Sequence, residues 1–306
     1  MKLATMRDGS RDGQLVVVSR DLTQAHYASG VANSLQQVLE DWNFLAPELQ
    51  GLYAELNAGR ARHAFALDTA QCLSPLPRTH GWFAGCPYPS HLERCAREKA
   101  PTWRQEPGGA FLAPTATWAC AGVTDLDFSA GLAVITGDVP RGCAPEQAVE
   151  RVRLLTLALT LMQAQAQADG GRSCASAFAP VAVTPDELGE AWHAAKAHLT
   201  VQVQLNGRKF GLCDAGADMA QDFGACVARN AQAQGMAAGS IVGALPVSHA
   251  DAARGFCSLR ERRCVEAAQD GEATTPWLQA GDELRVQARS SAGDTPLFGA
   301  IHLQLS

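Results

Sequence analysis

The sequence predicts an α+β protein, in which a small N-terminal α/β domain precedes a larger body built mostly of β-strands. The chain opens with a hairpin pattern over residues 2–19, and apolar residues at helical spacing follow over residues 31–56. Beyond about residue 70 the helical period gives way to Pro, Gly, Trp and Cys, and then to short apolar runs typical of strands. We therefore expect an N-terminal domain over residues 1–70 and a second domain over residues 71–306.

The elements of the first domain follow from local signals. Residues 2–6 and 14–19 are apolar runs separated by the turn-forming segment 8–13, which contains two glycines. A first helix is predicted where apolar side chains recur at helical spacing over residues 31–42. A second helix is predicted over residues 49–56, after Pro47.

The second domain contains one predicted long helix and several predicted strands. The helix runs from Pro145 towards Ala168 and includes the apolar run 154–162, which we interpret as a buried helical segment. The dipeptide Asn206-Gly207 predicts a two-residue hairpin turn. The predicted strands share short apolar runs between turn residues, and they are 132–136, 199–205, 283–288 and 297–305.

Composition excludes several function classes. The 306 residues include 25 Lys and Arg against 31 Asp and Glu, a net charge of −6, which lacks the basic face of a general nucleic-acid binder. No apolar run approaches the roughly 20 residues that cross a bilayer, and the charged start resembles no signal peptide, so we expect a cytoplasmic location without membrane contact. The ten cysteines form no Cys-x-x-Cys pair, so a zinc site or a disulfide scaffold is not expected.

Generic catalytic motifs are absent, but segments along the whole chain are similar to one family. One of them reads Ala133-Val134-Ile135-Thr136-Gly137-Asp138-Val139. Others, in the same order as in the family, are 2–5 with 8–19, 177–189, 211–216, 239–243 and 297–301. In these segments the chain resembles the fumarylacetoacetate hydrolase family, in particular its bacterial two-domain members.

The resemblance implies a fold and an activity. It implies a C-terminal mixed β-roll under the small N-terminal domain, assembled as a homodimer. It also implies hydrolysis of C–C bonds in β-diketo acids, or decarboxylation and isomerisation of related keto acids, at a Mg²⁺ or Ca²⁺ ion held by carboxylates.

The family's four metal carboxylates are replaced in this sequence. The first ligand position, seven residues before His91, is Ala84, and the Glu-x-Glu pair is matched by Ser129 and Gly131. The fourth ligand position, an Asp in the family, is Thr160. Hard divalent cations require charged oxygen ligands, and none of these residues supplies one. We therefore expect no metal ion and no other cofactor.

Neighbouring residues bear on the same site. The family's substrate-contacting Lys is matched by Ser173. Asp125 and Asp127 could hold a weak replacement site, but Asp127 projects from a different depth of the same strand face. Because the replacing side chains are smaller than carboxylates, we expect them to leave an open pocket that still binds a small molecule.

Two functional positions of the family persist. His91 matches the family's water-activating His and Glu261 matches its partner Glu, a pair able to act as a general base. Alternatively, His91 is a solvated loop residue and Glu261 pairs with Arg262 or Arg263. Cys86, two residues after Ala84, could be a new nucleophile, although a cysteine without an activating partner is usually inert.

Three function classes follow. The first is a divergent family member that binds a small keto acid or diketide-like molecule and is either inactive or acts without metal through His91 and Glu261. The second is a non-catalytic partner subunit of an active paralogue. The third is a conventional metal-dependent hydrolase or decarboxylase of β-diketo acids, whose ligands lie at positions other than those matched above.

Overall fold

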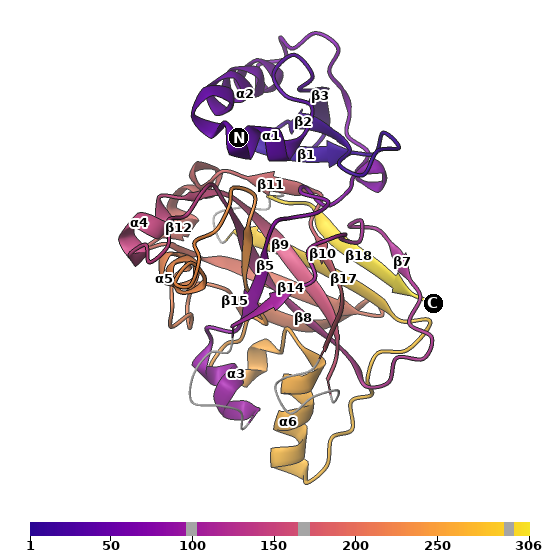
Figure 1. The fold of residues 1–306 in the computed structure, drawn as a ribbon. Coiled ribbons are helices and arrows are strands. Elements are labelled where there is room, and N and C mark those ends of the chain that lie inside the picture. Colours follow the sequence, from indigo (N-terminus) through magenta and orange to yellow (C-terminus); the bar gives the residue numbers. More distant parts are fainter. Residues whose placement is uncertain (96–102, 165–171, 291–296) are drawn as a thin grey trace.

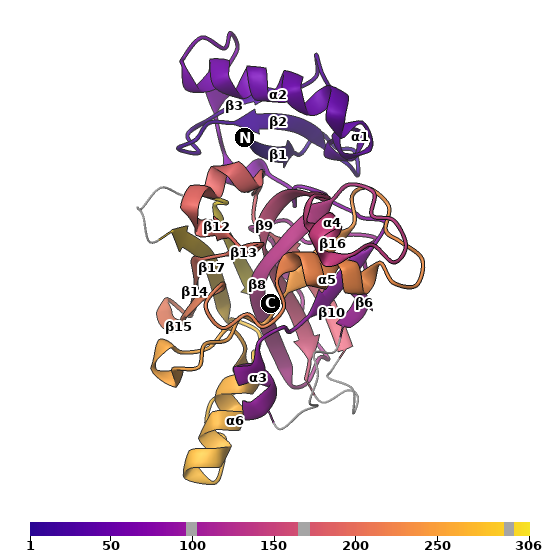
Figure 2. The same ribbon diagram turned by 90° about the vertical axis from the view of Figure 1, so that its left-hand side faces the viewer.

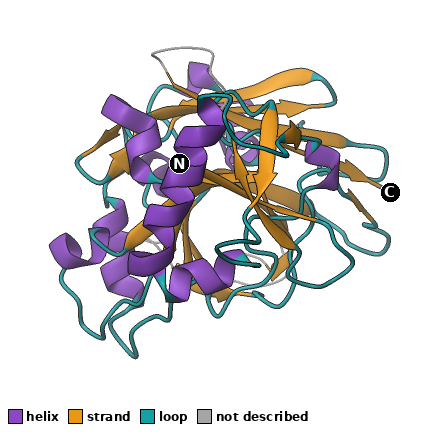
Figure 3. Ribbon diagram, turned by 90° about the horizontal axis from the view of Figure 1, so that it is seen from above, coloured by secondary structure: helices purple, strands orange, loops and turns teal. Residues whose placement is uncertain are grey.

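The computed structural model describes residues 1–95, 103–164, 172–290 and 297–306. A small N-terminal layer lies on one end of a larger β-rich body (Figure 1). Helices α3 and α6 lie together at the opposite end of that body, in both side views (Figure 2). Seen from the N-terminal side, the helices gather mainly on one side of the molecule (Figure 3). None of the helices in the described ranges is long and apolar enough to span a membrane.

The N-terminal domain is a small antiparallel sheet covered by helices. The sheet contains β1 (Lys2–Met6), β2 (Gln14–Val18), β3 (Gln24–Tyr27) and β4 (Phe65–Ala66), and the helices are α1 (Leu35–Glu40) and α2 (Trp42–Asn57). The predicted hairpin is confirmed, because β1 and β2 pair antiparallel with Lys2 opposite Val18. The second helix begins at Trp42 and not after Pro47, which lies within it. A proline there removes one intrahelical hydrogen bond, and the buried Leu49, Tyr53 and Leu56 anchor the remaining turns.

The N-terminal sheet continues directly into the body. Strand β1 pairs antiparallel with β11 (Val181–Val183), so that eleven strands of the described chain form one sheet in the order β4-β3-β2-β1-β11-β9-β8-β16-β5-β6, with β10 paired to β9. Its other strands are β5 (Trp82–Gly85), β6 (Trp103–Glu106), β8 (Leu126–Thr136), β9 (Val152–Gln163), β10 (Arg172–Phe178) and β16 (Ile241–Ala244).

A second sheet completes the body. In the described ranges it has five strands in the order β15-β14-β17-β18-β7. These are β7 (Thr117–Trp118), β14 (Leu199–Leu205), β15 (Arg208–Asp214), β17 (Glu283–Ser290) and β18 (Ala300–Leu305). A separate two-stranded sheet pairs β12 (Trp192–His193) with β13 (Lys196–Ala197). The helices of the body are α3 (Pro89–Arg94), α4 (Pro145–Val149), α5 (Phe223–Asn230) and α6 (Leu259–Asp270). Short 3₁₀ segments span Thr69–Gln71, Pro185–Ala191 and Ala252–Arg254, and the second of them is interrupted by a kink at Gly189.

The predicted hairpin between β14 and β15 is confirmed. Asn206 and Gly207 have φ angles of 52° and 71°, the left-handed conformation that a tight two-residue turn requires. The predicted strands 132–136, 199–205 and 283–288 are confirmed as β14 and as parts of β8 and β17. The predicted strand 297–305 is confirmed only from Ala300, where β18 begins. The mixed helix and strand content therefore matches the predicted α+β class.

The predicted helix over residues 145–168 is wrong. Only its first turn is helical, as α4, and Val152–Gln163 form strand β9; residues 165–168 lie outside the described residues. Strand β9 lies between β8 and the pair β10 and β11, and its two faces are buried. A strand buried on both faces reads as a continuous apolar run, without the alternation that identifies a half-exposed strand.

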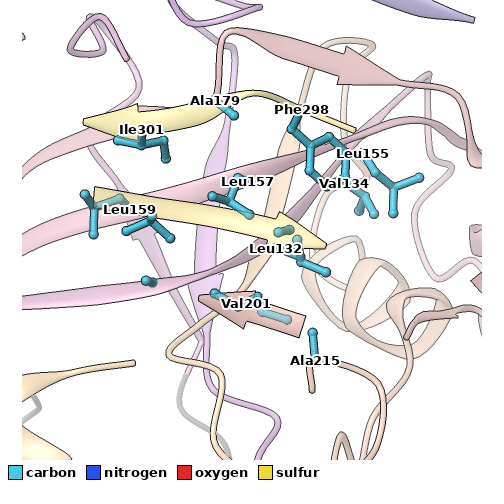
Figure 4. Packing of buried hydrophobic residues seen from close by; sticks show 14 of the residues in the cluster. Leu132, Val134, Leu155, Leu157, Leu159, Ala179, Val201, Ala215, Phe298 and Ile301 are labelled. Carbon is cyan, nitrogen blue, oxygen red and sulfur yellow. The ribbon is translucent and has the colours of Figure 1, made fainter. Parts of the chain in front are cut away.

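The two faces of β8 and β9 enter different apolar layers. On one face their large aliphatic side chains pack against the second sheet, as Leu132, Leu157, Val201 and Ile301 show (Figure 4). On the opposite face the residues are mostly small, and they lie in a separate layer with Trp82 and Phe178. The residues matched to the family's metal ligands belong to this second face.

Candidate functional site

His91 and Glu261 meet where helices α3 and α6 pack together. His91 lies on α3 and Glu261 in the first turn of α6, and His91 Nδ1 is 3.0 Å from Glu261 Oε2. The His91 side chain is 13% exposed and that of Glu261 is 0% exposed. His91 is therefore a helical, largely enclosed residue and not a solvated loop residue. Its Nδ1 carries the proton in the neutral ring because a carboxylate only accepts, which leaves Nε2 as an acceptor.

The Glu261 carboxylate has two further partners. Arg94 Nη1 and Ser248 Oγ donate to Oε1 over 2.8 Å and 2.6 Å. Burial by itself raises the pKa of Glu261, but the hydrogen bonds from His91, Ser248 and Arg94 outweigh it and hold that pKa below its usual value. Glu261 therefore stays ionised at neutral pH and keeps His91 oriented.

The suggested pairing of Glu261 with its neighbours on α6 is wrong. Arg262 pairs with Glu266, with Nε 2.9 Å from Oε1, and the Arg263 guanidinium lies over the Trp277 ring. Side chains that follow Glu261 directly on a helix point away from it, so they do not reach a carboxylate that faces α3.

Arg94 and Ser248 are site residues that sequence reasoning missed. Arg94 also donates to the carbonyls of His249 and Ala250, over 2.8 Å and 2.5 Å, and Ser248 Oγ lies 2.7 Å from Ser90 Oγ. These contacts join α3 to the loop after β16. The spacing of Arg94 three residues after His91, which places both on one helix face, is a signal that could have identified it.

The Asp127 carboxylate accepts hydrogen bonds from the first backbone amides of α6. It is 2% exposed, and its Oδ1 accepts from the backbone amides of Phe128, Leu259 and Arg260 over 2.7 Å, 2.8 Å and 3.3 Å. Burial raises the pKa of Asp127 to about 6, against the opposing effect of these hydrogen bonds. This carboxylate positions the helix that carries Glu261, and it is not a spare metal ligand.

The structure brings the four residues matched to the metal ligands to one face of the large sheet. Ser129 on β8 lies directly opposite Thr160 on β9, and Gly131 lies opposite Ala158. Ala84 on β5 is joined to β8 through β16. Ser129 is also bridged to Ser258, beside the start of α6, so this face adjoins the His91–Glu261 pair.

The expected open pocket is absent at Gly131. A Cβ atom on Gly131 would collide with the carbonyl oxygen of Ala244 and with Leu245, so the end of β16 and the residue after it fill this position. Ser129 and Thr160 are 4% and 1% exposed.

The hydroxyls on this face bond to one another and to an indole. Thr160 Oγ1 lies 3.1 Å from Ser176 Oγ, which also accepts from Trp82 Nε1 over 3.1 Å. The residues present therefore do not fit a Mg²⁺ or Ca²⁺ ion, which requires several charged oxygens in an accessible cavity. Within the described ranges, no group of three or more His, Cys, Asp or Glu side chains is arranged to hold a metal.

Two other residues singled out in the sequence have ordinary surroundings. Cys86 is buried, its Sγ lies 3.4 Å from the Pro246 carbonyl oxygen, and burial raises its pKa, which keeps the thiol unreactive. Ser173 on β10 is hydrogen-bonded to Glu106.

One cavity lies away from these residues. A hollow of about 430 Å³ is lined by residues of the N-terminal domain, among them Gln36 and Glu40, and by the segment that includes Arg78 and His80. It contains none of the residues matched to the family's site.

Solved structures with the same fold cover the full chain. They include the fumarylacetoacetate hydrolase of Exiguobacterium antarcticum, at 17% identity and a TM-score of 0.72, over 100% of this chain and 99% of that one. They also include maleylpyruvate hydrolase from Sphingobium sp. SYK-6, at 16% identity and a TM-score of 0.68 over 100% of both chains. The latter protein was also solved in complex with manganese(II) and pyruvate. No curated protein matches the sequence.

Family models match almost the entire sequence. Residues 1–78 match the fumarylacetoacetase N-terminal domain 2, and residues 82–301 match the fumarylacetoacetate (FAA) hydrolase C-terminal domain. The second match alone covers more than half of the chain. The chain therefore belongs to the fumarylacetoacetate hydrolase family.

Proposed function

We propose that this protein binds a small keto acid or diketide-like molecule and transfers a proton at His91 without a divalent cation. The observation that carries the proposal is the buried, ionised Glu261, which fixes the His91 ring and leaves Nε2 as the acceptor. The hydrogens on the carbon next to a ketone are its most acidic ones, and a positioned imidazole is the usual general base for such a proton. The proton moves from that carbon to Nε2 and returns to the same or a neighbouring carbon.

The family's C–C hydrolysis is not part of the proposal. The maleylpyruvate hydrolase relative was solved with manganese(II), whereas the matched positions here supply hydroxyl groups and no charge. At Gly131 a ligand side chain would also collide with Ala244. Without a cation, the family's route for polarising the two substrate oxygens and stabilising the leaving enolate is lost.

Hydrogen exchange tests the proton-transfer function directly. We expect the protein, in D₂O with EDTA, to accelerate deuterium incorporation at C3 of 2-oxobutyrate, followed by proton NMR. His91→Gln should abolish the acceleration and Glu261→Gln should reduce it by about 10²-fold or more, the usual range for a general base. The matched control is His302→Gln, because His302 also pairs with a glutamate, Glu283, at 2.7 Å, but these two side chains are 37% and 41% exposed.

Metal dependence is tested in parallel. Calorimetric titration with Mg²⁺, Mn²⁺ and Ca²⁺ should show no stoichiometric binding, and acetylpyruvate should not be cleaved. Cleavage that a chelator abolishes and a metal restores would contradict the proposal and favour the conventional metal-dependent hydrolase or decarboxylase.

A second candidate is a non-catalytic partner subunit. The observation that favours it is the closed sheet face at Gly131, where Ala244 and Leu245 occupy the space a ligand side chain would need. Wild-type exchange no faster than that of His91→Gln, with no metal-dependent cleavage, would support this candidate over proton transfer.

A further inference from the structure

We propose that Cys95 and Cys264 are a redox-active thiol pair, which a hydroperoxide oxidises reversibly to a disulfide between α3 and α6. Cys95 follows the last residue of α3, four residues after His91, and Cys264 lies on α6, three residues after Glu261. The two helices pack against each other (Figures 1 and 2), and the two thiols are hydrogen-bonded. The two thiols thus lie on the helix faces that carry His91 and Glu261, called the dyad below.

Accessibility distinguishes this pair from the other cysteines. Cys213 and Cys257 are also hydrogen-bonded to each other, but both are 0% exposed, so an oxidant does not reach them. Cys264 and Cys174 are partly exposed, whereas Cys95 is buried. The Cys174 sulfur contacts the Arg172 carbonyl oxygen at 3.6 Å. Cys264 therefore combines access to solvent with contact to a second thiol.

The chemistry assigns a separate role to each sulfur. The hydrogen bond with Cys264, together with burial, raises the pKa of the Cys95 thiol, so the more exposed Cys264 attacks the peroxide. Its thiolate displaces one oxygen as water and becomes a sulfenic acid. The Cys95 sulfur then attacks the sulfenic sulfur, and hydroxide leaves with the Cys95 proton as a second water. Two thiols are oxidised to one disulfide while one hydrogen peroxide is reduced to two waters.

Oxidation would change the surroundings of His91. The Cys95 Sγ is 4.0 Å from Nδ1 and 3.9 Å from Nε2 of His91. Forming the bond brings the two sulfurs to about 2.05 Å, which draws Cys95 towards α6 and alters its contact with the imidazole. A regulatory effect on catalysis rests on the proposed function, but formation of the disulfide does not.

Thiol counting and peptide mapping test the bond. One equivalent of hydrogen peroxide should lower the number of free thiols in the unfolded protein from ten to eight, and dithiothreitol should restore it. Non-reducing digestion should yield a peptide pair joined through Cys95 and Cys264. Cys95→Ser and Cys264→Ser should each lose this pair, whereas Cys174→Ser should keep it. An unchanged count, an over-oxidised Cys264 without a disulfide, or a bond through other cysteines would overturn the proposal.

The effect on the dyad has its own readout. The imidazole NMR signals of His91, assigned with His91→Gln, should shift in the oxidised wild type and not in peroxide-treated Cys264→Ser. This measurement requires no turnover, so it remains informative if the exchange assay fails. A disulfide that leaves the His91 signals unchanged would overturn its influence on the dyad.

Discussion

Glu261→Gln removes the charge at the centre of the site while nearly preserving its shape. Arg94 then loses a partner at 2.8 Å, and the two side chains are 17% and 0% exposed. Removing one partner of a buried ion pair costs about 3–5 kcal/mol, because the remaining charge is left without compensation. Arg94 keeps the carbonyls of His249 and Ala250, so we expect a loss near the lower end, about 3 kcal/mol.

Urea unfolding at pH 7 measures this loss against a matched exposed pair. Arg78 Nε lies 2.7 Å from Asp12 Oδ1, but these side chains are 52% and 43% exposed. Asp12→Asn should therefore cost about 0–1 kcal/mol. An equal loss of unfolding free energy in Glu261→Gln and Asp12→Asn would show that burial does not strengthen the contacts of Glu261, which would refute this prediction.

The pH dependence gives the same prediction a second check. The pKa of Glu261 is lower in the folded protein than in the unfolded chain, where a glutamate titrates near 4.3. Its ionised form therefore contributes stability above about pH 4.3, and this contribution is lost as the pH falls through the lowered pKa. The difference in unfolding free energy between wild type and Glu261→Gln should shrink in acid, and a constant difference would contradict the assignment.

Three further predictions concern other parts of the molecule. The pKa of Asp127 is raised to about 6 in the folded protein, so the stability that its protonated form contributes is lost as the pH rises from 4 to 6. Over that interval the unfolding free energy of Asp127→Asn should rise by up to about 3 kcal/mol relative to that of the wild type. Parallel pH profiles of the two proteins would contradict this. Gly131→Ala should destabilise the protein by about 1–3 kcal/mol, because the added methyl group would collide with the backbone of Ala244. Gly51→Ala is the control and should not destabilise the protein, because Gly51 lies on α2 with open space around it. Equal melting temperatures of the two variants would refute the close approach at Gly131. The resemblance to the family predicts a homodimer, so light scattering should give about twice the chain mass of 32.3 kDa, and a monomer at micromolar concentration would remove this prediction.

Local sequence signals determined the elements that depend on neighbouring residues. The hairpin of β1 and β2 and the turn at Asn206-Gly207 were predictable because turn chemistry is set by a few adjacent residues. Strand β9 was not, because burial of both faces removes the alternation that separates a strand from a helix.

Identifying the candidate site required both the sequence and the tertiary structure. The resemblance to the family singled out His91 and Glu261, and the sequence by itself showed that the matched metal positions carry no charge. Helical spacing places Arg94 on the same face as His91, but only the tertiary structure showed that Arg94 contacts Glu261 across 167 residues and that the space at Gly131 is closed. The physical reason is that buried ion pairs and close backbone approaches join segments distant in sequence, so no local pattern records them.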